Sequence, residues 1–362
     1  MAAIGLSLGL TPGCGLEPTF SAPVETGVVL TAGLGGSSGS SSGGADGTGS
    51  TSTTGGVGED STAGEATAPP VRLDGGIPDG GEPVVGCKGK IDFLFVVSAE
   101  GTMEWHQKQL VAAFPEFMAA IEAKLEGFDV HILVTNGAPG WKMEDCSWCA
   151  DPADCDPLAS PPGCGATVDK CDQQFGAGIT FPAAEGASNR RCDLYGGNRY
   201  IISGEPDLAA AFSCIATVGL DTYDAVPVDS AFAALDPKIN TPPFCNGGFL
   251  RDDALLVVTL IHDTYDESSQ GYPTQWAAKF VEVKHGNPDA LMVLALSTDI
   301  DQLEHLCLPD EQPHLEYPNQ LRRLTQKVKH GRFGSICMPD FGPFFADAVD
   351  EMVELCDNLI PQ

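Results

Sequence analysis

Basic residues are scarce in this chain of 362 residues, which has 19 lysines and arginines against 50 aspartates and glutamates and a formal net charge of −31. Such a charge repels phosphate backbones and anionic lipid headgroups, and it attracts cations or basic partners. We therefore expect no nucleic-acid ligand. The same acidity also serves to keep an exported protein soluble, so it does not identify a ligand by itself.

Long apolar runs and common catalytic motifs are also missing. No stretch after the first residues approaches the roughly 20 apolar residues of a membrane-spanning helix. Residues 83–362 have no G-x-S-x-G elbow, no Walker loop, no G-x-G-x-x-G and no HExxH spacing among their seven histidines. We therefore expect a binding protein and not an enzyme. A hydrolase built on Glu100, His262 and Asp263 is one alternative, although His262 is more simply a packing residue, and a structural envelope lipoprotein without a metal site is another.

The N-terminal segment resembles an export signal followed by a spacer. Residues 1–20 contain an apolar run, and Gly13 directly precedes Cys14, as at the end of a bacterial lipoprotein signal peptide where the cysteine receives the lipid. A plain secretory peptide that is cleaved nearby is the alternative. Residues 21–82 are rich in Gly, Ser and Thr and cannot bury apolar area, so they predict a disordered linker. We expect an extracytoplasmic protein, either secreted or attached to the outer membrane or cell surface only through its lipid.

Twelve further cysteines fall in the predicted folded region, residues 83–362, and six of them lie in a Pro-, Asp- and Gly-rich insertion at 140–200. The twelve are Cys87, Cys146, Cys149, Cys155, Cys164, Cys171, Cys192, Cys214, Cys245, Cys307, Cys337 and Cys356. In an exported chain they predict disulfides, while the C-x-x-C pair at the start of the insertion also fits half of a zinc site. From the layout we expect two pairs, Cys307 with Cys337 and Cys87 with Cys356, and we expect the insertion above the carboxyl edge of the sheet.

Apolar runs alternate with amphipathic segments through the folded region. Strands are predicted at 91–97, 128–135, 254–262, 290–297 and 334–337, and helices at 104–125, 207–217, 227–235, 273–285, 318–330 and 343–359. This alternation predicts an α/β fold with a doubly wound, mostly parallel sheet covered by helices on both faces. Ligands of such sheets bind at the carboxyl ends of the strands.

The segment Val96–Met103 (V-V-S-A-E-G-T-M) ends the first predicted strand and begins the first long helix. It resembles the D-x-S-x-S loop of von Willebrand factor type A domains, and residues 87–356 resemble the cysteine-rich, lipoprotein-like bacterial branch of that family. The resemblance implies a metal-ion-dependent adhesion site and a binding or adhesion function toward a protein or surface ligand. The residues implied in the metal site are Ser98, Glu100 and Thr102 in the first loop, Asp221 and Thr222 in the second, and Asp263 in the third.

The first loop departs from the family pattern at two positions, because Ser98 replaces an aspartate and Glu100 replaces a serine. Two interpretations follow. The site persists in altered form, holding Mg²⁺ or Ca²⁺ through Glu100, Thr102, Asp263 and either Asp221 or Thr222, with a carboxylate of the partner completing the shell. Alternatively no cation binds, and Glu100 is a carboxylate placed favourably near a helix N-terminus.

Overall fold

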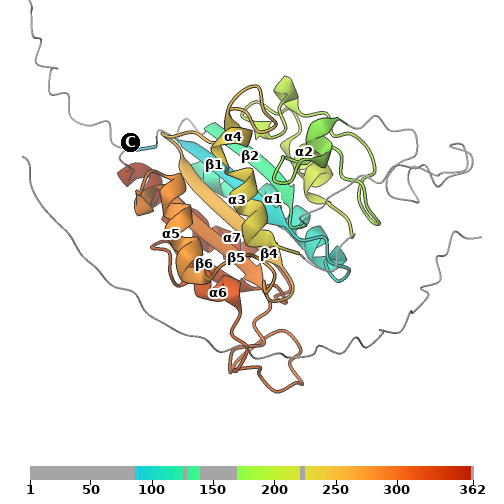
Figure 1. Cartoon of the computed structure of the whole chain (residues 1–362), viewed down its shortest axis with the longest axis vertical. Helices are drawn as coiled ribbons and strands as arrows, with labels where there is room; N and C mark the ends of the chain where they lie inside the picture. The colour runs from blue at the N-terminus through green and yellow to red at the C-terminus, as the bar shows by residue number, and fades with distance from the viewer. Residues whose placement is uncertain (1–85, 88, 125–128, 139–168, 221–224, 360–362) are drawn as a thin grey trace, which may run out of the picture. The chain divides into compact units, whose positions relative to one another are not determined.

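One six-stranded sheet forms the centre of the domain (Figure 1). The structure is a computed structural model that describes residues 86–87, 89–124, 129–138, 169–220 and 225–359. The strands are β1 (Lys90–Val97), β2 (Asp129–Asn136), β3 (Ile201–Ile202), β4 (Leu255–His262), β5 (Leu291–Ser297) and β6 (Gly331–Ser335). Their order across the sheet is β3-β2-β1-β4-β5-β6, and every neighbouring pair is parallel except β2 with β3.

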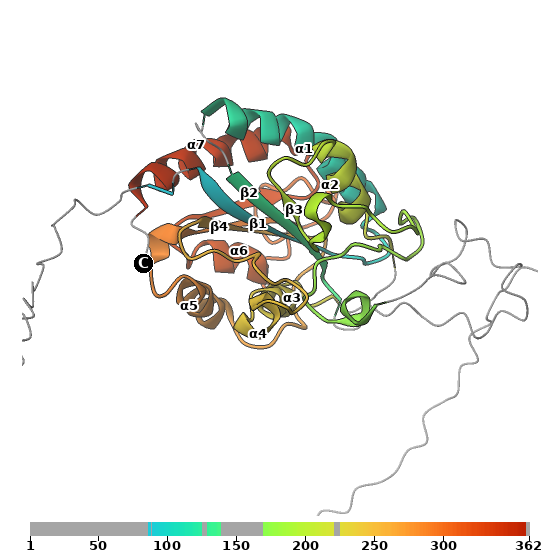
Figure 2. The same ribbon diagram turned by 90° about the horizontal axis from the view of Figure 1, so that it is seen from above.

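Helices cover both faces of this sheet, as Figure 2 shows. One face carries α1 (Glu104–Lys124), α2 (Leu208–Ala216) and α7 (Gly342–Asn358), and the other carries α3 (Pro227–Ala234), α4 (Pro237–Asn240), α5 (Pro273–Val283) and α6 (Gln320–Thr325). Single-turn 3₁₀ helices occupy Lys170–Gln173, Tyr195–Gly197 and Pro288–Ala290. The predicted fold class is therefore confirmed.

The sheet separates two hydrophobic cores, which explains why its central strands are apolar along their whole length. In β1, Phe93 and Phe95 pack toward the α1, α2 and α7 layer, whereas Leu94 packs toward α3, α5 and α6. The first core includes a stacked pair of rings, Phe114 on α1 and Phe212 on α2, with centroids 3.6 Å apart. Burial on both faces removes the polar alternation that a half-exposed strand would show.

Several elements differ from the sequence-based expectation, in existence or in bounds. The antiparallel edge strand β3 was not predicted, and the helix expected to reach His330 ends at Thr325. Because a Cβ on Gly331 would lie 2.0 Å from the Thr325 carbonyl oxygen, the chain must pass tightly over the helix end at this point. That crossing begins β6 at Gly331, three residues earlier than predicted.

Four disulfides join described residues: Cys87–Cys356, Cys171–Cys245, Cys192–Cys214 and Cys307–Cys337. The first and last are the two pairs that the layout predicted. Disulfides in this number are typical of an extracytoplasmic or secreted protein. Cys14, Cys146, Cys149, Cys155 and Cys164 lie outside the described residues, so the lipid site and the half zinc site remain predictions.

The described part of the insertion packs along the outer side of β2. The Ile179 amide donates to the Val134 carbonyl oxygen at 2.8 Å, and the Leu220 amide donates to the Glu185 carbonyl oxygen at 2.8 Å. Residues 169–200 therefore extend from the sheet edge toward the segment that precedes α3. Within the described residues, none of the helices combines the length and apolar character needed to cross a membrane.

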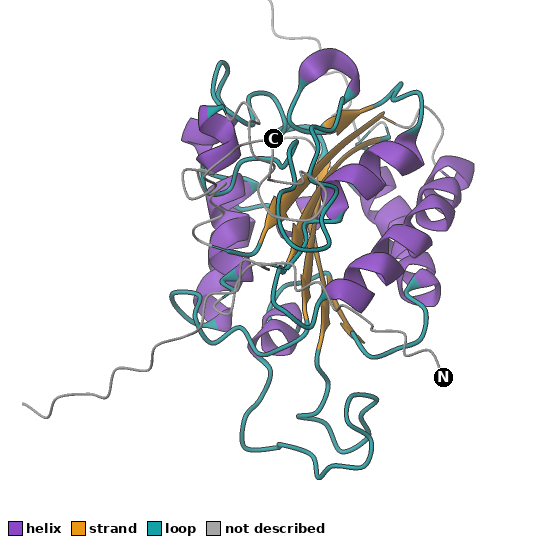
Figure 3. Cartoon of the chain, turned by 90° about the vertical axis from the view of Figure 1, so that its right-hand side faces the viewer, coloured by secondary structure: helices purple, strands orange, loops and turns teal. Residues whose placement is uncertain are grey.

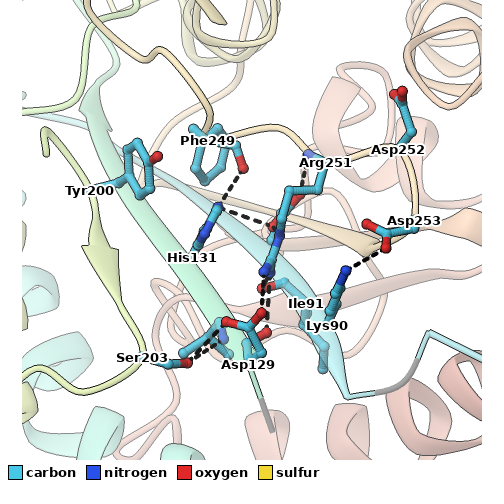
Figure 4. A network of polar contacts seen from close by, with 12 residues as sticks. Lys90, Ile91, Asp129, His131, Tyr200, Ser203, Phe249, Arg251, Asp252 and Asp253 are labelled. Atoms are coloured by element: carbon cyan, nitrogen blue, oxygen red, sulfur yellow. Dashed lines mark hydrogen bonds and ion pairs between the residues drawn. The ribbon is translucent and has the colours of Figure 1, made fainter. Parts of the chain in front are cut away.

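A charged network closes the amino-terminal end of β1, β2 and β4 (Figure 4). The Asp92 side chain is fully buried, and its carboxylate accepts hydrogen bonds from Arg251 Nε at 2.8 Å and from the Arg251 amide at 2.7 Å. Arg251 also donates to the half-exposed carboxylate of Asp129 at 2.8 Å. Burial raises the pKa of Asp92 to about 6, against the opposing attraction of Arg251 and Lys284.

Candidate functional site

The register of the sheet brings two predicted site loops together. Strands β1 and β4 are parallel neighbours with Val97 opposite Ile261, so the residues that follow them emerge at the same carboxyl edge. The Ser98 amide continues the ladder by donating to the Ile261 carbonyl oxygen at 2.9 Å. As a result, ligand atoms of Glu100, His262 and Asp263 all lie within 4.8 Å of one another.

Three hydrogen bonds hold Glu100 in this cluster, two to its carboxylate and one from its backbone amide. Its Oε1 accepts from the Ala225 amide at 3.3 Å, and its Oε2 accepts from the Thr264 hydroxyl at 3.3 Å. The Glu100 amide donates to Ser98 Oγ at 3.3 Å, which tightens the turn after β1. Glu100 is thus oriented by the turn after β1, by the segment before α3 and by the loop after β4.

The partners of His262 indicate which ring nitrogen carries the proton. Its Nε2 lies 2.9 Å from Thr264 Oγ1 and 3.4 Å from the Tyr265 carbonyl oxygen. Because a carbonyl oxygen only accepts and the Thr264 hydroxyl donates to Glu100, we assign the hydrogen to Nε2. The lone pair is then on Nδ1, a buried atom that has no hydrogen-bond partner in the described structure.

The cluster has negative charge and no basic neighbour to balance it. Among the described residues, no ion pair includes Glu100 or Asp263, and the buried Oδ1 of Asp263 has no hydrogen-bond partner. A buried carboxylate oxygen without a partner is costly unless a cation or a donor satisfies it. Two carboxylates and an imidazole at this spacing fit a divalent cation.

Gln107 on α1 connects the first loop to the second. Its Nε2 donates to the carbonyl oxygens of Ser98 and Gly219 at 3.0 Å each, and its Oε1 accepts from the Gly219 amide at 3.0 Å. Gly219 adopts φ +83°, and a Cβ there would lie 2.6 Å from Ala184 Cβ, so the position requires glycine. This buried glutamine was not identified from the sequence, because an amide at a helical core position gives no sequence signal.

The predicted site residues have different outcomes. Glu100 and Asp263 lie together, with candidate ligand atoms within 4.8 Å of each other. Ser98 is fully buried and supports the turn, and Thr102 is exposed in the turn that precedes α1. Asp221 and Thr222 lie outside the described residues. His262, expected to be a packing residue, is a member of the cluster; its position next to Asp263 at a strand end was the available signal.

A further carboxylate in the β4–α5 loop has a separate role. Asp266 is buried, and its oxygens accept from the Val228 amide at 3.2 Å and from the Ser269 amide at 3.0 Å. Burial raises the pKa of Asp266, and the hydrogen bonds that its carboxylate accepts from Ser269 and from the Val228 amide oppose that rise. Asp266 therefore caps the beginning of α3 and fixes the loop that carries Asp263.

Comparisons with known proteins give distant structural neighbours only. No protein-family model and no curated protein sequence matches this chain. Proximal thread matrix protein 1 from the mussel byssus matches in two crystal forms, with TM-scores of 0.34 and 0.36 and 10% sequence identity. The two matches cover 75% and 77% of this chain, and 47% and 49% of the mussel protein chain. A von Willebrand factor type A protein from Catenulispora acidiphila matches with a TM-score of 0.33 and 12% sequence identity, and the match covers 73% of this chain and 42% of that protein chain. The chain spans less than half the length of each of these proteins.

Proposed function

We propose that this domain is a binding module that holds a divalent cation at the carboxyl edge of its sheet and presents it to a partner. The observation that carries the proposal is the convergence of Glu100, His262 and Asp263 within 4.8 Å, together with a buried Asp263 oxygen that has no partner in the described structure. A cation placed there would neutralise two carboxylates that have no basic neighbour among the described residues.

The donor atoms favour a transition metal over Mg²⁺ or Ca²⁺. Mg²⁺ and Ca²⁺ prefer shells made entirely of oxygen, whereas one imidazole with two carboxylates suits Zn²⁺ or Mn²⁺. The expectation of Mg²⁺ or Ca²⁺ was drawn from an all-oxygen loop, and His262 changes that chemistry. Three protein ligands leave at least one coordination position for an oxygen of the partner.

A binding function is proposed over catalysis because the neighbouring acid groups are engaged. Metal-assisted hydrolysis needs a general base within reach of the attacking water. Asp266 accepts two backbone hydrogen bonds at the start of α3, and the Thr264 hydroxyl donates to Glu100. A partner protein or surface ligand that supplies a carboxylate is the simplest occupant of the open position.

The experiment is isothermal titration of the purified chain with Zn²⁺, Mn²⁺, Mg²⁺ and Ca²⁺. We expect one transition-metal ion per chain, with affinity at least tenfold lower in Glu100→Gln and in Asp263→Asn. Glu267→Gln is the matched control, because Glu267 is exposed in the same acidic loop and is not a member of the cluster. His262→Gln, which offers an oxygen in place of the nitrogen, should reduce the preference for Zn²⁺ over Ca²⁺.

Two results would contradict this proposal. One is the absence of heat and of any change in melting temperature at millimolar ion, which would favour a structural domain without a cation. The other is equal affinity in the cluster variants and in Glu267→Gln. Retention of a partner from envelope extracts should be lost in EDTA and in Glu100→Gln.

We also propose that the domain is exported and attached through a lipid on Cys14, as the N-terminal sequence suggests. Disulfides among the described residues support export, and the attachment rests on the sequence alone. Metabolic labelling with an alkyne fatty acid should mark the wild-type chain and not Cys14→Ser. Labelling of neither chain would favour the plain secretory peptide.

A further inference from the structure

Exposed apolar side chains are concentrated at the carboxyl edge of the sheet. Among the described residues, nine large apolar side chains are exposed by 53–77%. Seven of them follow the carboxyl ends of β1, β4 and β5: Trp105, Tyr272, Leu303, Leu306, Leu308, Leu315 and Tyr317. Scattered exposed leucines are ordinary, but a concentration of this kind is typical of an interaction surface.

Five of the seven belong to one segment, residues 298–319, which we call the β5–α6 loop. It extends away from the body of the domain below α6, as Figure 1 and Figure 3 both show. Leu303 has the largest exposure of the group, 77%, and Tyr317 is 60% exposed. The loop therefore carries apolar side chains where the domain's own cores cannot cover them.

Several internal contacts fix the shape of this loop. The buried carboxylate of Asp299 accepts from the Leu306 amide at 2.7 Å and from the Cys307 amide at 2.9 Å. At the base, Asp301 Oδ2 accepts from the Asn319 amide at 2.8 Å and from Arg322 Nε at 3.0 Å. Cys307 is also joined to Cys337 beyond β6. A loop ordered in this way loses little conformational entropy when it binds.

Leu308 shows that the loop accepts backbone strain while exposing a large side chain. Its φ is +49°, in the left-handed region that costs about 1 kcal/mol or more for a residue other than glycine. The side chain is 55% exposed, so burial within the chain does not offset this cost. Glycine would relieve the strain, which indicates that the leucine side chain itself serves a purpose.

The charge of the loop identifies the kind of partner. Residues 298–319 include six carboxylates and no lysine or arginine. Four are exposed, namely Glu304, Asp310, Glu311 and Glu316, and no ion pair of the described structure includes any of them. An apolar surface bordered by uncompensated negative charge complements a segment with basic and large apolar residues, and it repels anionic membranes.

The β5–α6 loop also adjoins the other loops of this edge. The Ser297 hydroxyl donates to the Thr264 carbonyl oxygen at 2.9 Å. Asn319, the last residue of the β5–α6 loop, donates through Nδ2 to the same Ser297 hydroxyl oxygen at 2.9 Å. The base of the β5–α6 loop therefore lies beside the β4–α5 loop, which carries Asp263.

We infer that the β5–α6 loop is a docking surface for a cationic, apolar-bearing segment of a partner protein. The leucines and Tyr317 pack against apolar side chains of that segment, and the four exposed carboxylates pair with its lysines or arginines. This contact needs no cation, so it stands or fails independently of the metal cluster.

The test measures binding of a fluorescent synthetic Leu/Lys helical peptide to the full chain in EDTA, by fluorescence anisotropy. We expect Leu303→Ser combined with Tyr317→Ser to weaken binding at least tenfold. Leu308→Gly should weaken it without lowering the melting temperature. The matched control is Tyr195→Ser with Phe244→Ser, which removes two aromatic rings that are 53% and 60% exposed and lie outside the β5–α6 loop, and it should change affinity less than twofold.

Charge is tested separately. Glu304→Gln with Glu311→Gln should weaken binding, added salt should weaken binding to the wild-type chain, and a Leu/Glu peptide should not bind. Equal affinity of the loop variants and the control variant would overturn the inference, as would binding of anionic or zwitterionic vesicles in preference to the peptide. A concentration-dependent dimer that disappears in the Leu303 and Tyr317 variant would also overturn it, because a second copy of the chain would then cover the loop.

Discussion

Removing the guanidinium of Arg251 should leave the buried Asp92 carboxylate without its cationic partner. The Asp92 side chain is fully buried, and in Arg251→Met its carboxylate keeps the hydrogen bond from the backbone amide of position 251 at 2.7 Å and the contact with His131 Nδ1 at 3.7 Å (Figure 4). Breaking a buried ion pair by deleting one partner typically costs about 3–5 kcal/mol. Domains are stable by only about 5–15 kcal/mol, so the variant should lose a large part of its free energy of unfolding at neutral pH.

The stability loss of Arg251→Met should be smaller at acidic pH, because Asp92 is then protonated and is buried without a charge. Burial raises the pKa of Asp92 from 3.8 to about 6, so the folded chain binds this proton more tightly than the unfolded chain. The stability from this group is fully present below pH 3.8 and is lost as pH rises through about 6. Without Arg251 the pKa of Asp92 rises further, so Asp92 is neutral at about pH 5. The loss of unfolding free energy in Arg251→Met should then fall to roughly 1–2 kcal/mol, which is the contribution of the hydrogen bonds that the guanidinium donated.

Urea denaturation followed by circular dichroism measures both values. Asp129→Asn is the control, because the Asp129 side chain is 43% exposed and its pair with Arg251 should contribute no more than about 1 kcal/mol. The double variant Asp92→Asn with Arg251→Met removes both charges and should regain much of the lost stability. The same loss at both pH values, or a loss below about 1 kcal/mol at neutral pH, would refute this reasoning.

Three further changes test the packing, the site and the covalent framework. Phe212→Ala should lower the free energy of unfolding by about 3–5 kcal/mol, because its ring stacks on Phe114 with an interplanar angle of 5°; a loss below about 1 kcal/mol in urea would contradict this packing. Gln107→Leu leaves buried backbone groups of two site loops unpaired, so calorimetry should show a stability loss of roughly 2–3 kcal/mol and weaker ion binding. Cys192→Ser with Cys214→Ser opens a disulfide with a separation of 22 residues and should cost about 3 kcal/mol, whereas unchanged denaturation would show that the link contributes nothing.

The fold could be predicted from the sequence where burial of a strand on both faces produces a continuous apolar run. Strands β1, β4 and β5 are continuous apolar runs, and their predicted positions agree with the structure within about one residue at each end. The strand β3, Ile201–Ile202, and the helix α4, Pro237–Asn240, are too short to show any periodicity. Both are set by tertiary contacts that no local pattern records.

The candidate site could be predicted from the sequence only in part, because some of its contacts form only in the folded chain. The alternating pattern predicts that the strands before Glu100 and Asp263 are parallel, so a shared carboxyl edge could be inferred, while the pairing of these two residues was implied by the resemblance. That the two strands are neighbours is seen in the structure. The role of His262 depends on the hydrogen bonds of its ring with Thr264 and Tyr265, which exist only in the folded chain. The partner of Asp92 is 159 positions away, and nothing in the sequence connects the two.

Under the proposed attachment through the N-terminal segment, the bond between Cys87 and Cys356 would decide where a pulling force enters the domain. The Gly86 amide donates to the Leu359 carbonyl oxygen, and the Cys87 amide donates to the Cys356 carbonyl oxygen, so the chain enters the domain against the end of α7. Tension on the segment before Gly86 passes through the covalent link into that helix before it reaches β1. The force would therefore act first on the packing of α7 against α1, and β1 would be less readily pulled out of the sheet.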